Sequence, residues 1–263
     1  MPAPTPNWAT EFHPFTAQHA ASSLACMALI VGACWLGRRW RREGARGGVK
    51  ERRFRAAWIA TTIAWQALAV VYWLLPANFR LDQSLPLHLC DLAAWVAPLA
   101  LWTQKRWLRA VLYFWGIGLS TQAFVTPVLE EGHADVRYWL FFIGHTQIVG
   151  SAIYDAAVLG FRPRLRDWGI ASLLTFAWMA AIMPLNIAFD LNYGYIGNQR
   201  ADKPTLIDSL GTWPLRILWL VLLGQLAFFL IYIPWPIAER LGRSARGQAA
   251  QPAFEEPESR GAR

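Results

Sequence analysis

The chain has 263 residues, of which 55% are hydrophobic and only 16% are charged, and its formal net charge is +8. A soluble domain of this length usually carries about 25% charged residues, so the composition argues against a soluble globular protein. Because the basic residues lie mainly in short segments between apolar stretches, the positive charge indicates membrane topology rather than nucleic-acid binding.

The apolar stretches have the length of membrane-spanning helices. A helix needs about 20 mainly apolar residues to cross the hydrocarbon core. The sequence predicts seven such helices, near residues 18–37, 56–75, 86–103, 110–128, 138–160, 168–189 and 214–235. The expected fold class is an all-α membrane protein, a seven-transmembrane-helix bundle in one domain (18–237), with an outside N-terminal segment (1–17) and a disordered cytoplasmic tail (238–263).

Positive charge alternates between the loops. The loops after the first, third and fifth predicted helices, together with the tail, hold 20 of the 25 basic residues. By the positive-inside rule the tail is cytoplasmic and the N-terminus is outside, which an odd number of helices satisfies. The expected location is therefore a cytoplasm-facing membrane, and the family resemblance described below implies the cytoplasmic membrane of a bacterium. Asp155, near the cytoplasmic end of the fifth helix, is expected to pair with arginines of the loop that follows it.

The candidate chemistry begins at the head of the third predicted helix. There His88, Cys90 and Asp91 lie within four residues, at a depth where lipid makes polar groups costly. His88 and Asp91 are three residues apart and share a helix face. Cys90 lies about 200° around the helix from His88, so His88 is poorly placed to act as its base. Cys26 and Cys34, within the first helix, are typical of small apolar packing residues.

Polar residues of other predicted helices reach a similar depth. With a rise of about 1.5 Å per residue, Cys90 lies roughly 6 Å below the outer helix ends, Gln122 roughly 9 Å and His145 roughly 10 Å. Asn186 lies nearer the outer face. The resulting hypothesis is nucleophilic catalysis: His145 takes the thiol proton of Cys90, and the thiolate attacks an acyl carbonyl. Asp91, Gln122 or Asn186 would orient the imidazole or stabilise the oxyanion.

Several segments together resemble one family. The run 85–95, which contains the His-Leu-Cys-Asp sequence, is similar to the signature of the YwaF-like bacterial integral membrane family. The further segments that carry this resemblance are 113–116, 121–127, 137–145, 193–199 and 210–214. The animal relatives of that family resemble cysteine-dependent acyltransferases that move a fatty acyl chain between phospholipids.

The resemblance implies a catalytic role for Cys90, with phospholipids as partners, and carries His145 over as its base by analogy with related membrane hydrolases. Asn198, within the 193–199 segment, joins the candidate supporting residues. The residue after the cysteine is Asp91, where the animal pattern has a histidine.

Other functions fit the same polar layer. A hydrolase differs from a transferase only in whether water reaches the acyl-enzyme. A non-enzymatic binder of lipids or small molecules, such as a sensor or transporter, would use the layer as a pocket, and a haem between His88 and His145 is a further alternative. A retinal protein is excluded because its Schiff base needs a lysine within the bundle, whereas Lys50, Lys105 and Lys203 all lie in loops. No metal site and no cofactor are expected.

Overall fold

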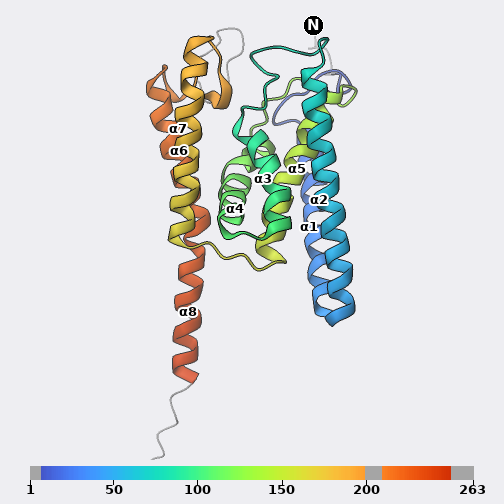
Figure 1. Ribbon diagram of the computed structural model, residues 1–263, viewed down its shortest axis with the longest axis vertical. Helices are drawn as coiled ribbons and strands as arrows, with labels where there is room; N and C mark the ends of the chain where they lie inside the picture. Colours follow the sequence, from blue (N-terminus) through green and yellow to red (C-terminus); the bar gives the residue numbers. More distant parts are fainter. Residues whose placement is uncertain (1–6, 199–208, 250–263) are drawn as a thin grey trace, which may run out of the picture.

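The computed structural model describes residues 7–198 and 209–249 of the chain, and these are largely helical (Figure 1). In chain order the elements are α1 (Ala17–Arg42), α2 (Gly44–Leu74), α3 (Leu89–Thr103), α4 (Arg106–Val111), the π-helix η1 (Leu112–Leu119), the 3₁₀-helix η2 (Ser120–Phe124), α5 (Val136–Ala157), α6 (Leu165–Ala188), the 3₁₀-helix η3 (Tyr193–Tyr195), α7 (Leu215–Tyr232) and α8 (Pro234–Ala249). Within the described ranges the only extended pairing is an isolated bridge between Glu11 and Glu131.

The helices agree with the seven predicted apolar segments. Among the described residues, four helical stretches are long and apolar enough to cross a membrane: α1, α2, α6 and the continuous run Leu215–Leu241. The fourth predicted helix differs most, because it is built from α4, η1 and η2 and ends at Phe124. A π-helix widens the turn, and such segments are uncommon and cannot be recognised from hydropathy alone.

The C-terminal boundary also differs from the expectation. Helix α8 continues through Ala249, so residues 238–249 are helical where the sequence predicted the start of a disordered tail. Pro234 stands at the first position of this helix, where proline is well tolerated, and the alanines and arginines that follow have high helix propensity. Residues 250–263 lie outside the described part of the chain.

Helix α5 lies at the centre of the main group of helices and packs against α1, α2, α3 and η1. Small residues allow this close packing. A Cβ added to Gly116 of η1 would lie 2.7 Å from Cβ of Ala152 on α5, and Ala97 of α3 is fully buried in the same region as Ala152. Small residues at helix contacts are typical of packing within membranes, where close backbone approach replaces the hydrophobic effect between helices.

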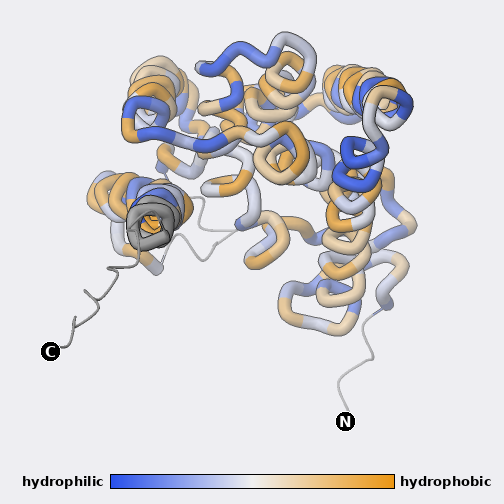
Figure 2. Tube along the Cα trace, turned by 90° about the horizontal axis from the view of Figure 1, so that it is seen from below, coloured by the Kyte–Doolittle hydropathy of each residue, from blue (hydrophilic) through white to orange (hydrophobic). Residues whose placement is uncertain are grey.

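The turns between α1 and α2, α3 and α4, and α5 and α6 all lie at one end of the molecule, which we call the basic end (lower end in Figure 1). Seen from that end, hydrophilic residues gather at the turns while apolar residues follow the helices (Figure 2). Large apolar side chains on the outer helices are exposed, for example Leu24 of α1 (69%) and Leu173 of α6 (68%). Exposure of this kind is expected where a helix faces lipid.

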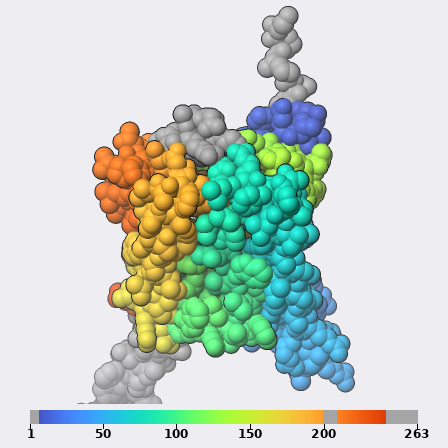
Figure 3. Space-filling model, turned by 45° about the horizontal axis from the view of Figure 1, so that its top comes forward, coloured from blue at the N-terminus to red at the C-terminus, as the bar shows by residue number. Residues whose placement is uncertain are grey.

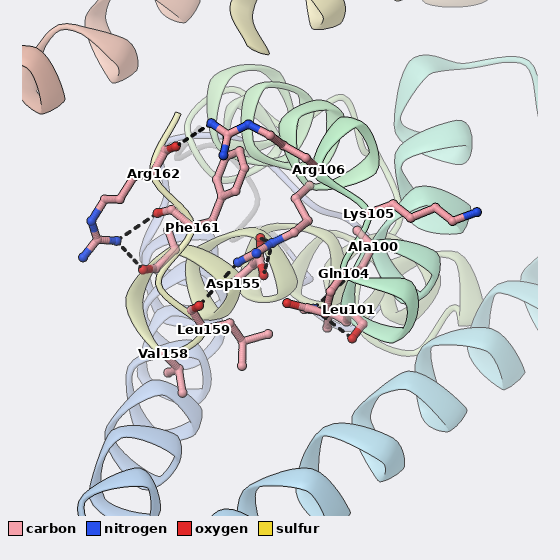
Figure 4. Close-up of polar contacts among 12 residues, drawn as sticks. Ala100, Leu101, Gln104, Lys105, Arg106, Asp155, Val158, Leu159, Phe161 and Arg162 are labelled. Atoms are coloured by element: carbon pink, nitrogen blue, oxygen red, sulfur yellow. Dashed lines mark hydrogen bonds and ion pairs between the residues drawn. The ribbon is translucent and has the colours of Figure 1, made fainter. Parts of the chain in front are cut away.

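Polar contacts join α4, α5 and the loop after α5 at the basic end (Figure 4). Arg109 Nε donates to both carboxylate oxygens of Asp155, at 3.0 and 2.9 Å, and Arg106 pairs with Asp167 at the start of α6. The partner of Asp155 therefore comes from α4, whereas the sequence suggested the loop after α5. The Arg162 side chain of that loop instead donates to the carbonyl oxygens of Ala156 and Phe161.

Candidate functional site

The head of α3 is held by its own residues. The chain is extended at His88 (φ −67°, ψ 151°), and Leu89 is the first helical residue. The Asp91 carboxylate accepts a hydrogen bond of 2.9 Å from the His88 backbone N–H. This is an N-terminal capping contact, and it satisfies a backbone donor at the helix start. The predicted proximity of His88 and Asp91 is therefore present, but through the His88 backbone rather than its imidazole.

The imidazole of His88 contacts the segment 192–197 that connects α6 with α7. Its Nδ1 accepts a hydrogen bond of 3.2 Å from the Gly194 backbone N–H, so a neutral ring carries its proton on Nε2. The ring also lies against two aromatic rings, with centroid distances of 5.0 Å to Tyr193 and 5.9 Å to Tyr195. His88 thus couples α3 to this segment.

Asn186 of α6 binds the same segment through both polar atoms of its side-chain amide. Its Oδ1 accepts from the Tyr193 N–H and its Nδ2 donates to the Tyr193 carbonyl, both at 2.9 Å. The Tyr193 hydroxyl in turn donates to the Leu81 carbonyl and accepts from the Leu85 N–H. Because these bonds use both the Asn186 oxygen and its NH₂ group, the described structure gives Asn186 a positioning role.

Gly194 is required where the segment meets α6. It has φ +67°, and an added Cβ would lie 2.1 Å from the Trp178 ring. Trp178 Nε1 donates to the Leu87 carbonyl at 3.0 Å, so the indole is held in place. Segment 192–197, α6 and the chain before α3 therefore form one closely packed cover over the head of α3.

Cys90 lies beneath this cover as the second residue of α3. Its side chain is partly exposed, whereas the thiols of Cys26 and Cys34 are buried. Cys90 packs against a buried cluster that contains Ala93 and Ile148. Since α3 begins three residues later than the sequence predicted, Cys90 lies close to the helix N-terminus rather than a full turn inside it.

His145 on α5 has one ring nitrogen engaged. Its Nδ1 lies 2.8 Å from the carbonyl oxygen of Phe141. A carbonyl only accepts hydrogen bonds, so Nδ1 carries the proton and the lone pair of a neutral ring lies on Nε2. Among the described residues Nε2 has no hydrogen-bond partner, and it makes no hydrogen bond with Cys90. The free nitrogen is available as a proton acceptor.

The register of α3 and α5 relates Cys90 to His145. Ala97 of α3 and Ala152 of α5 belong to one buried cluster, and Ala93 and Ile148 belong to the next cluster along the helices. The members of each pair are 55 residues apart in the sequence. Cys90 and His145 are also 55 residues apart, and they continue both series by one helical turn toward the outer end. The two helices run in the same direction and pack against each other (Figure 1).

Two predicted supporting residues lie elsewhere. The Gln122 side chain is exposed in η2, because the fourth helical stretch tightens there and stops before Pro127, so it does not join the buried polar layer. Asn198 is exposed at the end of a described range. Sequence reasoning missed Arg216, which is fully buried at the start of α7 and donates to the Gly197 carbonyl at 2.6 Å. The sequence feature that could have drawn attention to Arg216 is its position as a charged residue at the start of an apolar helix.

Comparison with known families decides the relationship of the chain. The model of the TMEM164 family, a family of transmembrane proteins, matches residues 14–232. The chain belongs to the TMEM164 family. It is thus a multi-pass membrane protein with apolar helices, and the family match runs from the segment before α1 to the end of α7, including Cys90 and His145. No curated protein and no solved structure matches this TMEM164-family chain.

Proposed function

We propose that this TMEM164-family protein is a lipid acyltransferase that uses Cys90 as its nucleophile and His145 as its base. The proposal is supported by the packing of Cys90 against the cluster that contains Ile148, one helical turn after His145 on α5, and by the free Nε2 of His145. This chemistry needs a nucleophile and a base whose orientations are fixed by neighbouring groups.

Cys90 lies at a helix N-terminus, next to Asp91 in the sequence. It is the second residue of α3, where the unpaired backbone N–H groups and the helix dipole favour negative charge. The same N–H groups are suited to stabilise an oxyanion on an acyl carbonyl bound above them. His88 and Asn186 then act as positioning residues, because their polar atoms hold the cover formed by segment 192–197.

The proposed reaction has two steps. His145 Nε2 takes the proton of Cys90, and the thiolate attacks the ester carbonyl of a phospholipid. The tetrahedral intermediate expels the lysophospholipid alkoxide, which takes the proton from His145, and an acyl thioester remains on Cys90. In the second step His145 removes the proton of an acceptor hydroxyl, which attacks the thioester and releases the thiolate. Water as the acceptor would make the enzyme a hydrolase.

The proposed topology follows from the distribution of charge. The basic end contains the arginine-rich turn between α1 and α2 and the turns before α4 and α6, so we place it in the cytoplasm of a bacterium, with the N-terminus outside. The reaction then takes place in the outer half of the cytoplasmic membrane. A membrane-impermeant thiol reagent applied to intact cells should label Ala134→Cys but not Thr103→Cys, and the opposite pattern would reverse the topology.

The direct test uses the purified full chain in proteoliposomes that contain a phosphatidylcholine with a fluorescent acyl chain. The wild type should acquire the label in a hydroxylamine-sensitive thioester and release lysophosphatidylcholine, and Cys90→Ala should do neither. Cys26→Ala is the matched control, because Cys26 lies in a packing cluster with Phe142. Equal labelling of the wild type and Cys90→Ala would refute the mechanism.

The alternative is a lipid or small-molecule binder that uses the same covered layer. It predicts that Cys90→Ala retains binding of the fluorescent lipid without any thioester in the wild type, while changes in segment 192–197 abolish binding. The two functions are therefore separated by whether acyl transfer to the protein occurs at all.

A further inference from the structure

We propose that the pocket between the first residues of α4 and of α6 binds the headgroup of an anionic phospholipid from the leaflet at the basic end. This inference is independent of Cys90 and of acyl transfer. It takes from the proposed function only the identity of that leaflet as the cytoplasmic one.

The pocket has a volume of about 460 Å³ and lies where α4 and α6 pack side by side. The two helices are neighbours in the space-filling view, α4 in green and the start of α6 in yellow (Figure 3). Its lining consists of Lys105, Arg106, Trp107, Arg164, Arg166, Asp167 and Ile170. Four cationic side chains thus face one anionic residue.

That anionic residue is already neutralised within the protein. Asp167 is 1% exposed, and its carboxylate receives bonds of 3.1 and 2.6 Å from Arg106. It also accepts from the Arg164 backbone N–H at 2.7 Å, so the N-terminus of α6 is capped and does not supply the anion affinity. The side chains of Lys105, Arg164 and Arg166 form no ion pair within the described ranges, and the pocket therefore carries three uncompensated positive charges.

The surroundings of the pocket favour a lipid over a free phosphate ion. Trp107 in its wall is 49% exposed, and indoles favour the boundary between headgroups and hydrocarbon. Exposed apolar side chains also occur on the helices that flank the pocket, with Trp102 at the end of α3 and Leu165 and Leu173 on α6. A lipid would place its phosphate among the cations and its acyl chains on this apolar surface. Basic pockets between helices on the cytoplasmic side are suited to such headgroups.

The test uses the full chain, delipidated in a non-ionic detergent, with native mass spectrometry and thermal unfolding as readouts. The probes are dioleoyl phosphatidylglycerol, tetraoleoyl cardiolipin, dioleoyl phosphatidylcholine and inorganic phosphate. At least one anionic lipid should give a stoichiometric adduct and raise the Tm, whereas phosphatidylcholine and phosphate should do neither. The triple variant Lys105→Gln/Arg164→Gln/Arg166→Gln should bind that lipid about 100-fold more weakly.

The matched control is Arg42→Gln/Arg46→Gln/Arg53→Gln. It removes the same charge from exposed side chains at the basic end, outside the pocket. An equal loss of lipid in the control would mean general surface attraction and would overturn the proposal, as would equal binding of phosphatidylcholine. A shift caused by inorganic phosphate alone would assign a phosphate site instead of a lipid site. If the triple variant fails to fold, Arg166→Gln, which leaves the Asp167 contacts intact, should still weaken binding by about fivefold.

Discussion

His145 donates its Nδ1 proton to the carbonyl oxygen of Phe141, one helical turn earlier, over 2.8 Å. This bond fixes the orientation of the ring and leaves the basic lone pair on Nε2. Ordinary helix geometry supplies it, since a side chain and the carbonyl four residues before it lie on the same face. His145 is thus held by a backbone carbonyl, rather than by a carboxylate, in the tautomer that can accept a proton at Nε2.

The first prediction concerns this histidine. His145→Gln retains a polar side chain of similar size but cannot carry the proton between the two steps. We expect the rate of acyl transfer to Cys90 to fall by about 10²–10⁴-fold, the usual contribution of general base catalysis. Single-turnover labelling in proteoliposomes measures this rate. The control is His133→Gln, because His133 is exposed in the loop before α5; a similar loss in both variants would argue against a specific role.

The second prediction separates Asn186 from Gln122, which the sequence grouped together. Asn186→Ala leaves the Tyr193 N–H and carbonyl without buried partners, which costs about 1–3 kcal/mol for each unsatisfied group. We expect a clear fall in the Tm of the purified protein. Gln122→Ala should change the Tm little, because that side chain is exposed. If Asn186→Ala leaves the Tm unchanged, segment 192–197 is held in place by other contacts.

The helical architecture was predictable because hydropathy responds to length and composition. Seven apolar segments and the paired loops of basic residues are visible without any structure, and the segments agree with the observed helices. Hydropathy does not show which type of helix a segment forms. The π-helix from Leu112 to Leu119 and the 3₁₀ turn after it shorten the fourth segment, and Gln122 consequently lies outside the polar layer.

The candidate site was predictable only in part. The cost of polar groups in lipid drew attention to His88, Cys90 and Asn186, but it gave no information on which groups they contact. The structure assigns His88 and Asn186 to segment 192–197, a partner that lies between two helices and carries no periodic signal. The packing of α3 against α5, in which Ala97 and Ala152 belong to one buried cluster, could not be predicted from hydropathy either.

The third prediction concerns pH in the loop before α5. Hydrogen bonding to the Arg137 guanidinium lowers the pKa of Asp135 below its usual value near 4. The carboxylate therefore stabilises the folded protein fully above about pH 5, and this contribution is lost as the pH falls through the lowered pKa. Because the pair is partly exposed, it contributes about 0.2–1 kcal/mol.

Asp135→Asn isolates this contribution, since the amide oxygen can still accept from the Arg137 backbone N–H. The difference in Tm between the wild type and Asp135→Asn should be constant from pH 7 to pH 5 and should shrink progressively as the pH falls below about 4. High salt should reduce the difference at pH 7, because a partly exposed pair is screened. A difference that grows as the pH falls would contradict the assignment.

The last prediction concerns the buried pair at the basic end. Asp155 is 2% exposed, and both of its oxygens accept from Arg109 Nε, which links α4 to α5 beneath the candidate site. Removing one partner leaves the other charge buried and uncompensated, which costs about 3–5 kcal/mol. Asp155→Leu and Arg109→Met should therefore each lower the Tm strongly, while the double variant should be closer to the wild type than either single variant, because an apolar pair needs no compensation. A thermal-unfolding double-mutant cycle measures this coupling. Additive losses would show that the two side chains stabilise the protein independently, through contacts such as that between Arg109 and the Leu159 carbonyl.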